Sequence, residues 1–138
     1  MQDLFHNLTV RPALAPASVD DDTAQESLVI DRRGYESLTF VIATGVIADA
    51  DASFAVLVEH GDESDLADAA AVPDAELLGT EALAGFGADD DTETRKIGYA
   101  GAKRYVRLTI TPGGNSADAY LAAVALLGAP HVAPTANP

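Results

Sequence analysis

The stretch that decides the fold class is Thr94–Ile110, which reads TRKIGYAGAKRYVRLTI. In its second half, alternate residues fall on two faces: Val106, Leu108 and Ile110 on one, and Tyr105, Arg107 and Thr109 on the other. A period of two with apolar residues on one side is typical of a strand that covers a core. Arg95–Tyr99 is a second strand candidate, and the intervening AGAK favours a turn. The stretch therefore predicts two strands joined by a turn.

Further strands are predicted on both sides of this stretch. The candidates are Glu26–Ile30, Ser37–Thr44 and Phe54–His60, which are rich in β-branched or aromatic residues. Ala119–Leu127 is ambiguous, because its Ala-rich composition suits a helix while its apolar residues also alternate as in a strand. Its neighbours are all strands, so we favour a strand. The fold class is therefore mainly β, a single-domain β-sandwich or barrel-like fold of roughly six to eight strands.

The segments around these strands suggest a division of the chain. Residues 1–19 contain Pro12 and Pro16, which disfavour helix, and are expected to form an extended N-terminal arm. Residues 20–128 form the β domain, which includes an irregular acidic loop at 61–94. Within that loop, Glu63–Val72 favours one or two helical turns that end at Pro73. Residues 129–138 are a Pro-rich tail that is not expected to pack as an element.

Composition limits the classes of partner. The chain has 138 residues, no cysteine and a formal net charge of −14. Because binding to phosphates is driven by Lys and Arg, this charge argues against nucleic acid and against an anionic membrane surface. The start of the chain, MQDLFHNLTV, carries no basic region of the kind that begins a signal peptide. Without cysteine, thiol chemistry and disulfides are excluded.

The sequence contains no pattern that predicts catalysis. No nucleophile elbow, phosphate-binding loop or dinucleotide fingerprint is present, and the three histidines are far apart in the sequence. Two DDDT runs, Asp20–Thr23 and Asp89–Thr92, have the oxygen ligands that Ca²⁺ prefers but not the spacing of an EF-hand. Acidic turns exposed to solvent explain them more simply. We therefore expect no enzyme, no metal and no cofactor.

The positive charge is concentrated in one place. Five of the eight Lys and Arg residues lie within Thr94–Ile110. Alternation on the second strand puts Lys103, Tyr105 and Arg107 on the side opposite the core, where they would form a docking stripe for a protein partner. Arg95 and Lys96, and the pair Arg32 and Arg33, would extend it. The alternative is that these cations neutralise nearby carboxylates within the chain.

Three segments carry a resemblance to a known family. They are LTVRPALAP near the start, YESLTFVIATG in the middle, and RKIGYAGAKRYVRLTI followed by GAPHVAPT. In this order they resemble a small family of virion structural proteins of tailed bacteriophages and prophages. The most family-like positions are Ile97, Gly98, Tyr99, Gly101, Lys103, Arg104, Tyr105, Val106 and Arg107, followed by the segment Gly34–Phe40.

The resemblance implies a role in the virion. It suggests a non-enzymatic head decoration, or cement, protein that is made in the host cytoplasm and lies on the capsid surface. Its expected partners are the major capsid protein and copies of itself, with a trimer as the favoured oligomer. One alternative is a neck, head-completion or tail component. A second is a calcium-dependent glycan-binding β-sandwich that uses the DDDT runs. A hydrolase is the most distant alternative, since no buried carboxylate pair is evident.

Overall fold

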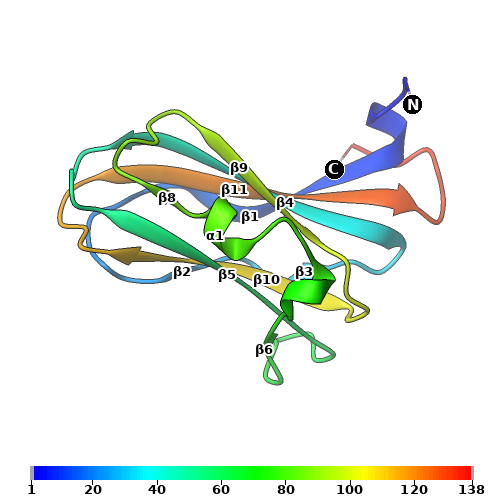
Figure 1. The fold of residues 1–138 in the computed structure, drawn as a ribbon. Coiled ribbons are helices and arrows are strands. Elements are labelled where there is room, and N and C mark those ends of the chain that lie inside the picture. The colour runs from blue at the N-terminus through cyan, green and yellow to red at the C-terminus, as the bar shows by residue number, and fades with distance from the viewer. Residues whose placement is uncertain (1, 138) are drawn as a thin grey trace.

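Two antiparallel sheets packed face to face form the molecule (Figure 1). The structure is a computed structural model that describes residues 2–137. One sheet has the order β1 (Leu8–Val19), β11 (Ala119–Pro130), β4 (Tyr35–Ile47), β9 (Thr94–Tyr99), β7 (Leu77–Leu78). The other has the order β2 (Gln25–Glu26), β10 (Tyr105–Gly113), β5 (Ser53–Gly61), β6 (Ala70–Ala71), with β3 (Ile30–Asp31) on β10 and β8 (Phe86–Gly87) on β5. The predicted β-sandwich is confirmed, with six longer strands and five two-residue strands among the described residues.

The core lies between the sheets and follows the period-two pattern. Strand β4 contributes Leu38, Phe40 and Ile42, which are at most 1% exposed, and β10 contributes Val106, Leu108 and Ile110, which are fully buried. Their neighbours in sequence point to the outer sides of the two sheets. Alternation in the sequence therefore determines which face of each long strand is buried.

Strand β11 resolves the ambiguity of Ala119–Leu127 in favour of a strand. It pairs with β1 on one side and with β4 on the other, so it lies inside the five-stranded sheet. Its buried residues are Ala119, Leu121, Ala123, Ala125 and Leu127. The alternate residues, which point outward, are apolar as well, and this is why periodicity did not distinguish helix from strand.

The N-terminal segment is part of the domain. Its expected extended conformation is present, but Leu8–Val19 is an edge strand paired along β11 and does not form a separate arm. The register shifts beside Pro12 and again before Ala17, where prolines remove backbone donors. The tail also packs: Thr135 donates its backbone N–H to the carbonyl of His6 over 2.9 Å and its hydroxyl to that of Leu8 over 2.6 Å. Both termini therefore lie at one end of the sandwich (Figure 1).

Residues 61–94 differ most from expectation. Glu63–Val72 forms turns and the short strand β6 in place of the predicted helical turns. The helical segments of the described chain are η1 (Phe5–Asn7), η2 (Asp74–Glu76) and α1 (Glu81–Ala84), and none is long and apolar enough to cross a membrane. Thr80 caps α1 by accepting the N–H of Leu83 over 3.0 Å. The predicted strand Glu26–Ile30 is interrupted and becomes β2 and β3.

Candidate protein-binding faces

The family-like residues build a corner that joins the two sheets. Tyr99, at the end of β9, is buried, and its hydroxyl forms a hydrogen bond with Nδ1 of His60 over 2.7 Å and accepts the backbone N–H of Lys103 over 3.0 Å. The guanidinium of Arg32 lies 5.4 Å from the centre of the Tyr99 ring and donates to the carbonyls of Gly101 and Lys103. Burial raises the pKa of the Tyr99 phenol. These residues thus fix the turn between β9 and β10.

Gly101 is required by this close packing. A Cβ on Gly101 would lie 2.4 Å from the hydroxyl oxygen of Tyr99, so any other residue would displace the ring. Gly98 is constrained in a similar way, because its Cβ would lie 2.8 Å from Cβ of Leu78 on the neighbouring strand. Both glycines of the motif therefore serve the packing of the chain.

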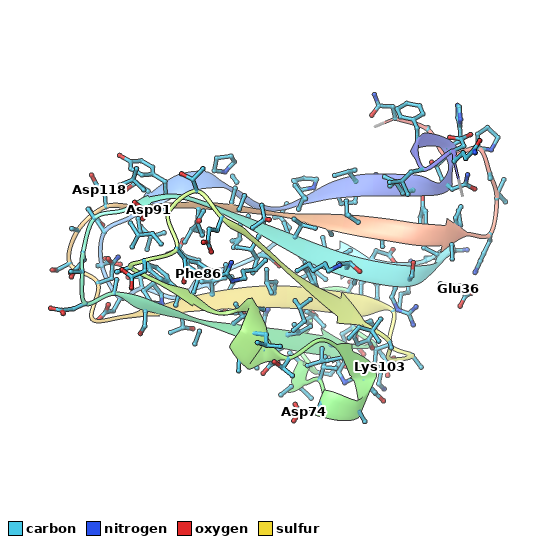
Figure 2. The ribbon with its side chains drawn as sticks, turned by 45° about the horizontal axis from the view of Figure 1, so that its top comes forward. Glu36, Asp74, Phe86, Asp91, Lys103 and Asp118 are labelled. Carbon is cyan, nitrogen blue, oxygen red and sulfur yellow. The ribbon has the colours of Figure 1, made fainter. Side chains whose placement is uncertain are left out.

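The cations at this corner have carboxylate partners within the chain. Nζ of Lys103 lies 2.7 Å from Asp62, and Arg104 makes two hydrogen bonds of 2.8 Å to Asp31. Hydrogen bonding to Asp62 raises the pKa of the Lys103 ammonium, and Arg104 lowers the pKa of the Asp31 carboxyl. Lys103 is the labelled residue beside this corner in Figure 2. Of the predicted interface residues, Lys103 is therefore paired within the chain, as the alternative of internal neutralisation expects.

The outer side of the second sheet carries the remaining part of the stripe. Tyr105 and Arg107 do point outward from β10, as predicted. Arg107 lies between two carboxylates, 3.0 Å from Glu59 on β5 and 3.5 Å from Glu26 on β2. The outer side of this sheet therefore carries a row of alternating charges formed by Glu26, Arg107 and Glu59.

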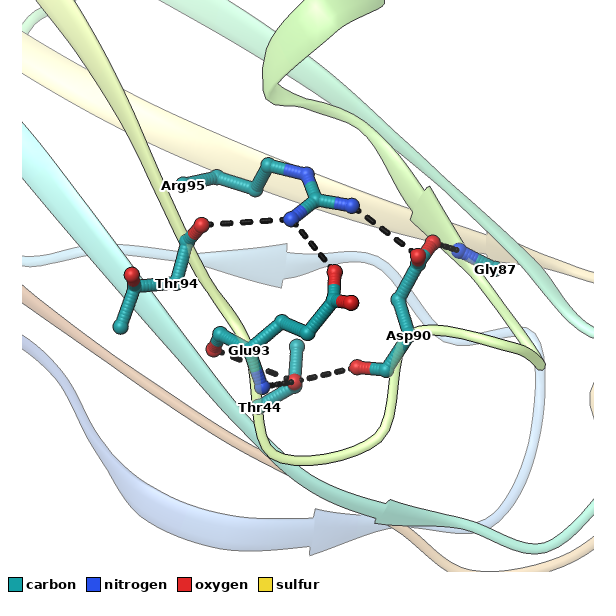
Figure 3. A network of polar contacts seen from close by, with 6 residues as sticks. All are labelled: Thr44, Gly87, Asp90, Glu93, Thr94 and Arg95. Carbon is teal, nitrogen blue, oxygen red and sulfur yellow. Dashed lines mark hydrogen bonds and ion pairs between the residues drawn. The ribbon is translucent and has the colours of Figure 1, made fainter.

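Arg95 and Lys96 lie on the other sheet. Figure 3 shows Arg95 held between Asp90 and Glu93, at 3.0 and 2.7 Å. The Thr44 hydroxyl closes the same turn by donating to the Asp90 carbonyl over 2.6 Å and accepting the Glu93 N–H over 2.9 Å. Lys96 points away from the core.

The seven predicted interface residues consequently do not form one stripe. Lys103, Tyr105, Arg107 and Arg32 gather around the corner and on β10, with Arg33 exposed in the adjoining turn. Arg95 and Lys96 belong to the other sheet and lie on opposite sides of β9, one against the acidic turn and one outward. Whether any of them binds a partner stays a prediction.

The DDDT runs act as caps of turns. Asp21 accepts the N–H of Thr23 over 2.8 Å, and Asp22 accepts that of Asn115 over 2.7 Å. In the second run, Asp90 accepts the N–H of Gly87 over 2.7 Å, which lowers the pKa of Asp90, and Asp91 accepts that of Ile47 over 3.0 Å. Within residues 2–137 no group of three or more His, Asp or Glu side chains is arranged to hold a metal ion.

The outer side of the five-stranded sheet has a different character, which alternation in the sequence did not predict. We call it the apolar face; its residues are Val10 of β1, Tyr120, Ala122, Val124 and Leu126 of β11, Thr39, Val41 and Ala43 of β4, Lys96 and Gly98 of β9, and Leu78 of β7. Pairing sets Val124 beside Val41, and Leu126 between Val10 and Thr39. Lys96 is the only charged member.

Carboxylates are nearly absent from this sheet. Of the 22 acidic residues, only Glu36 falls within the five strands, and it lies at the start of β4, where it binds the ring of His131. Figure 2 shows Glu36 at one end of the sandwich and Asp91 and Asp118 at the other. The negative charge is thus kept to the ends, the loops and the second sheet, and the apolar face is left without it.

A groove marks one end of the apolar face. It has a volume of about 470 Å³ and is lined by Pro16, Ala17, Ser18, Ala43, Thr44, Gly45, Tyr120, Leu121 and Ala122. Tyr120 is 48% exposed, although it is a large aromatic residue. At the rim, Ser18 donates its hydroxyl to Asp118 over 3.1 Å. The groove is therefore apolar inside and polar only at its edge.

Comparison with known proteins places the chain by its fold. No protein-family model and no curated protein sequence matches it. Among solved structures it is similar to the PBSX exported protein XepA, at 16% identity and a TM-score of 0.56, over 94% of this chain and 40% of XepA. The chain thus spans less than half the length of that protein.

Two xylan-related structures are also similar in outline. One is the xylan-binding module CBM15, at 12% identity and a TM-score of 0.43, over 94% of this chain and 95% of that module. The other contains the CBM22-1 and GH10 modules of Clostridium thermocellum xylanase 10B in complex with xylohexaose, at 11% identity and a TM-score of 0.45, over 96% of this chain and 28% of that protein. At these identities the likeness is one of β-sandwich fold alone.

Proposed function

We propose that this protein is a non-enzymatic structural component of a tailed-phage virion, and specifically a head decoration protein that binds the capsid shell. The observation that carries the proposal is the apolar face on a chain of net charge −14. A contiguous exposed apolar surface is typical of a chain that works in an assembly, where another chain or a second copy of the same chain covers it. We assign that assembly to a phage particle because the motifs resemble those of virion structural proteins.

The role of the most family-like residues supports a structural protein over a catalyst. Tyr99, Gly101 and Arg32 hold the corner between the sheets, and Arg104 is engaged by Asp31. The contacts of these polar groups are all made within the chain, where they hold the fold together.

A neck, head-completion or tail component is the second candidate, and copy number separates it from a decoration protein. The test is quantitative mass spectrometry of purified particles, with the major capsid protein as the internal standard. A ratio near one copy per shell subunit, or a simple fraction of it, is expected for decoration. A handful of copies per particle would assign the chain to the neck or tail, and absence from the particle would overturn the proposal.

The predicted contacts are tested by rebinding. Particles that lack the protein are mixed with the purified chain, and the bound copies are counted. The double variant Tyr105→Ala with Arg107→Ser is expected to bind fewer copies than the unchanged chain. A matched control is Thr111→Ala, which changes another outward residue of β10 far from the corner. Equal binding by a correctly folded double variant would exclude Tyr105 and Arg107 as contacts.

We do not propose calcium-dependent glycan binding. Asp21, Asp22, Asp90 and Asp91 already accept backbone N–H groups, and the two runs do not converge on a cluster of three acidic side chains within the described residues. Ca²⁺ needs six to eight oxygen ligands from one place.

A further inference from the structure

We infer that the apolar face is the contact between two copies of this chain, which pack through their five-stranded sheets about a two-fold axis. The inference concerns the isolated protein and goes beyond the proposed role in a particle. Its occupant is a second copy, as the distribution of charge over the chain indicates.

The distribution of charge favours a second copy over a basic partner as the occupant of the apolar face. Each copy carries a formal charge of −14, so two copies repel one another wherever their carboxylates meet. The apolar face contains no carboxylate, and within the strands of its sheet only the terminal Glu36 is acidic. A basic partner would be drawn to the acidic ends and loops. A second copy, which carries the same charge, meets the least repulsion where the acids are missing.

The side chains of the face suit contact with their own copy. Small residues alternate with larger ones along each strand: Ala122 lies between Tyr120 and Val124 on β11, and Ala43 follows Val41 on β4. A two-fold axis brings the same surface against itself, so large residues of one copy can lie over small residues of the other. Sheets that pack face to face interdigitate in this way.

Exposure and coverage agree with this assignment. Tyr120 is 48% exposed and Val124 is 36% exposed, values that would fall on dimer formation. Helix α1 contacts β5 and β9 and so bridges the two sheets at their open side, where Figure 1 shows it between them. Lys96 does not prevent burial, because the stem of a lysine can cover apolar surface while its ammonium reaches the rim.

Ionic strength gives the first test. The molar mass of the full chain is measured by sedimentation equilibrium at about 0.05 M and about 1 M NaCl, where the screening length falls from over 10 Å to about 3 Å. We expect a monomer–dimer equilibrium that becomes roughly tenfold tighter at the higher salt concentration, because salt screens the repulsion between copies. An interface made of ion pairs would weaken instead. A dimer that weakens, a chain that stays monomeric at both salt concentrations, or a trimer would overturn the inference.

Two matched variants locate the contact. Val124 lies on the apolar face and Leu57 on the outer side of the other sheet, and each is 36% exposed. Val124→Asp is expected to weaken dimer formation by roughly 100-fold, because the two-fold axis brings like charges near one another in a desolvated contact. Leu57→Asp should leave the dimer unchanged. Equal effects of the two variants would overturn the assignment of the face.

Cysteine labelling gives a readout that does not depend on an added charge. The chain has no cysteine, so Val124→Cys and Leu57→Cys each create a single thiol. Labelling of Val124→Cys by a maleimide should slow as protein concentration increases, while labelling of Leu57→Cys should not. Concentration-independent labelling at Val124 in a sample that forms dimers would place the contact elsewhere. No particle enters these experiments, so their outcome is separate from that of the proposed function.

Discussion

The two outer sides of the sandwich are built from strands of the same chain but handle charge in opposite ways. On the second sheet, Arg107 is held between Glu59 and Glu26, so charges are present and paired. On the five-stranded sheet, Lys96 is the only charged residue of the apolar face. The first arrangement keeps a surface hydrated with most of its charge neutralised. The second has little affinity for water, and this is the arrangement expected of a surface that another protein covers.

The acidic residues outside the two sheets also have a structural role. Most of the acidic residues lie in turns, where carboxylates accept backbone N–H groups, as Asp68 does from Asp62 and Glu63 over 2.8 and 3.1 Å. These carboxylates satisfy the N–H donors of a turn, and their charges make the ends of the molecule strongly negative. The large net charge is therefore partly a consequence of how the loops are capped.

The largest effect tests the difference between the inner and outer sides of one strand. Phe40 and Val41 are neighbours on β4, and Phe40 is fully buried while Val41 points outward. Phe40→Ala should lower the free energy of unfolding by about 3–5 kcal/mol, because it leaves a cavity in the core. Val41→Ala should cost less than about 1 kcal/mol in the monomer. Urea denaturation at low protein concentration measures both.

A large cost for Val41→Ala in the monomer would contradict the comparison, since it would mean that this side chain is already packed within one chain. At high concentration the expectation changes. If two copies cover the apolar face, the same substitution should also lower the stability of the dimer, and the difference between the two concentrations measures that contribution.

The next effect concerns the corner that links the two sheets. Tyr99→Phe removes the hydroxyl that bonds to His60 and accepts the N–H of Lys103. It leaves these partners unsatisfied in a buried place, and we expect a loss of about 1–3 kcal/mol by urea denaturation. Tyr105→Phe is the control, because Tyr105 is an outward residue of the adjacent strand. Equal losses in the two variants would show that the hydroxyl of Tyr99 has no special part in the corner.

The long strands were predictable because their physics is local. An alternation such as Val106, Leu108 and Ile110 against polar neighbours states which face is buried. The two-residue strands and the turns of residues 61–94 were not, because they form where a distant strand offers backbone partners. Ala70 and Ala71, for example, pair with His60 and Glu59 of β5, and no local pattern records this.

The candidate faces were predicted only in part. Alternation placed Tyr105 and Arg107 on the outer side of β10, but it did not show that Glu59 and Glu26 would lie beside Arg107. The apolar face was missed because β11 is apolar on both sides, so its pattern does not say which set is inward. One signal was available: Leu8–Val19 and Ala119–Pro130 contain no acidic residue in a chain that has 22.

A smaller effect tests the charged side. A double-mutant cycle between Arg107→Met and Glu59→Gln should give a coupling of about 1 kcal/mol at low salt, because a pair near the surface is weakened by solvent. The coupling should decrease at about 1 M NaCl. Dimer formation through the apolar face should change in the opposite direction, so the two sides respond to salt with opposite signs. A coupling that is unaffected by salt would show that packing, and not charge, joins Arg107 to Glu59.

The smallest effect is that of pH on the pair of Asp31 and Arg104. Arg104 lowers the pKa of Asp31, so the folded chain binds this proton less readily than the unfolded chain does. The stabilisation is therefore fully present above the ordinary aspartate pKa of about 4 and is lost as the pH falls further, through the lowered value. Asp31→Asn should lower the melting temperature at pH 7, by an amount equivalent to less than about 1 kcal/mol. The gap from the unchanged chain should close progressively below about pH 4.

Asp20→Asn, at an exposed position outside the strands, is the control and should show no such closing gap. A difference for Asp31→Asn that persists at low pH would mean that the carboxylate acts through its shape and its hydrogen bond to the N–H of Arg33, and not through its charge.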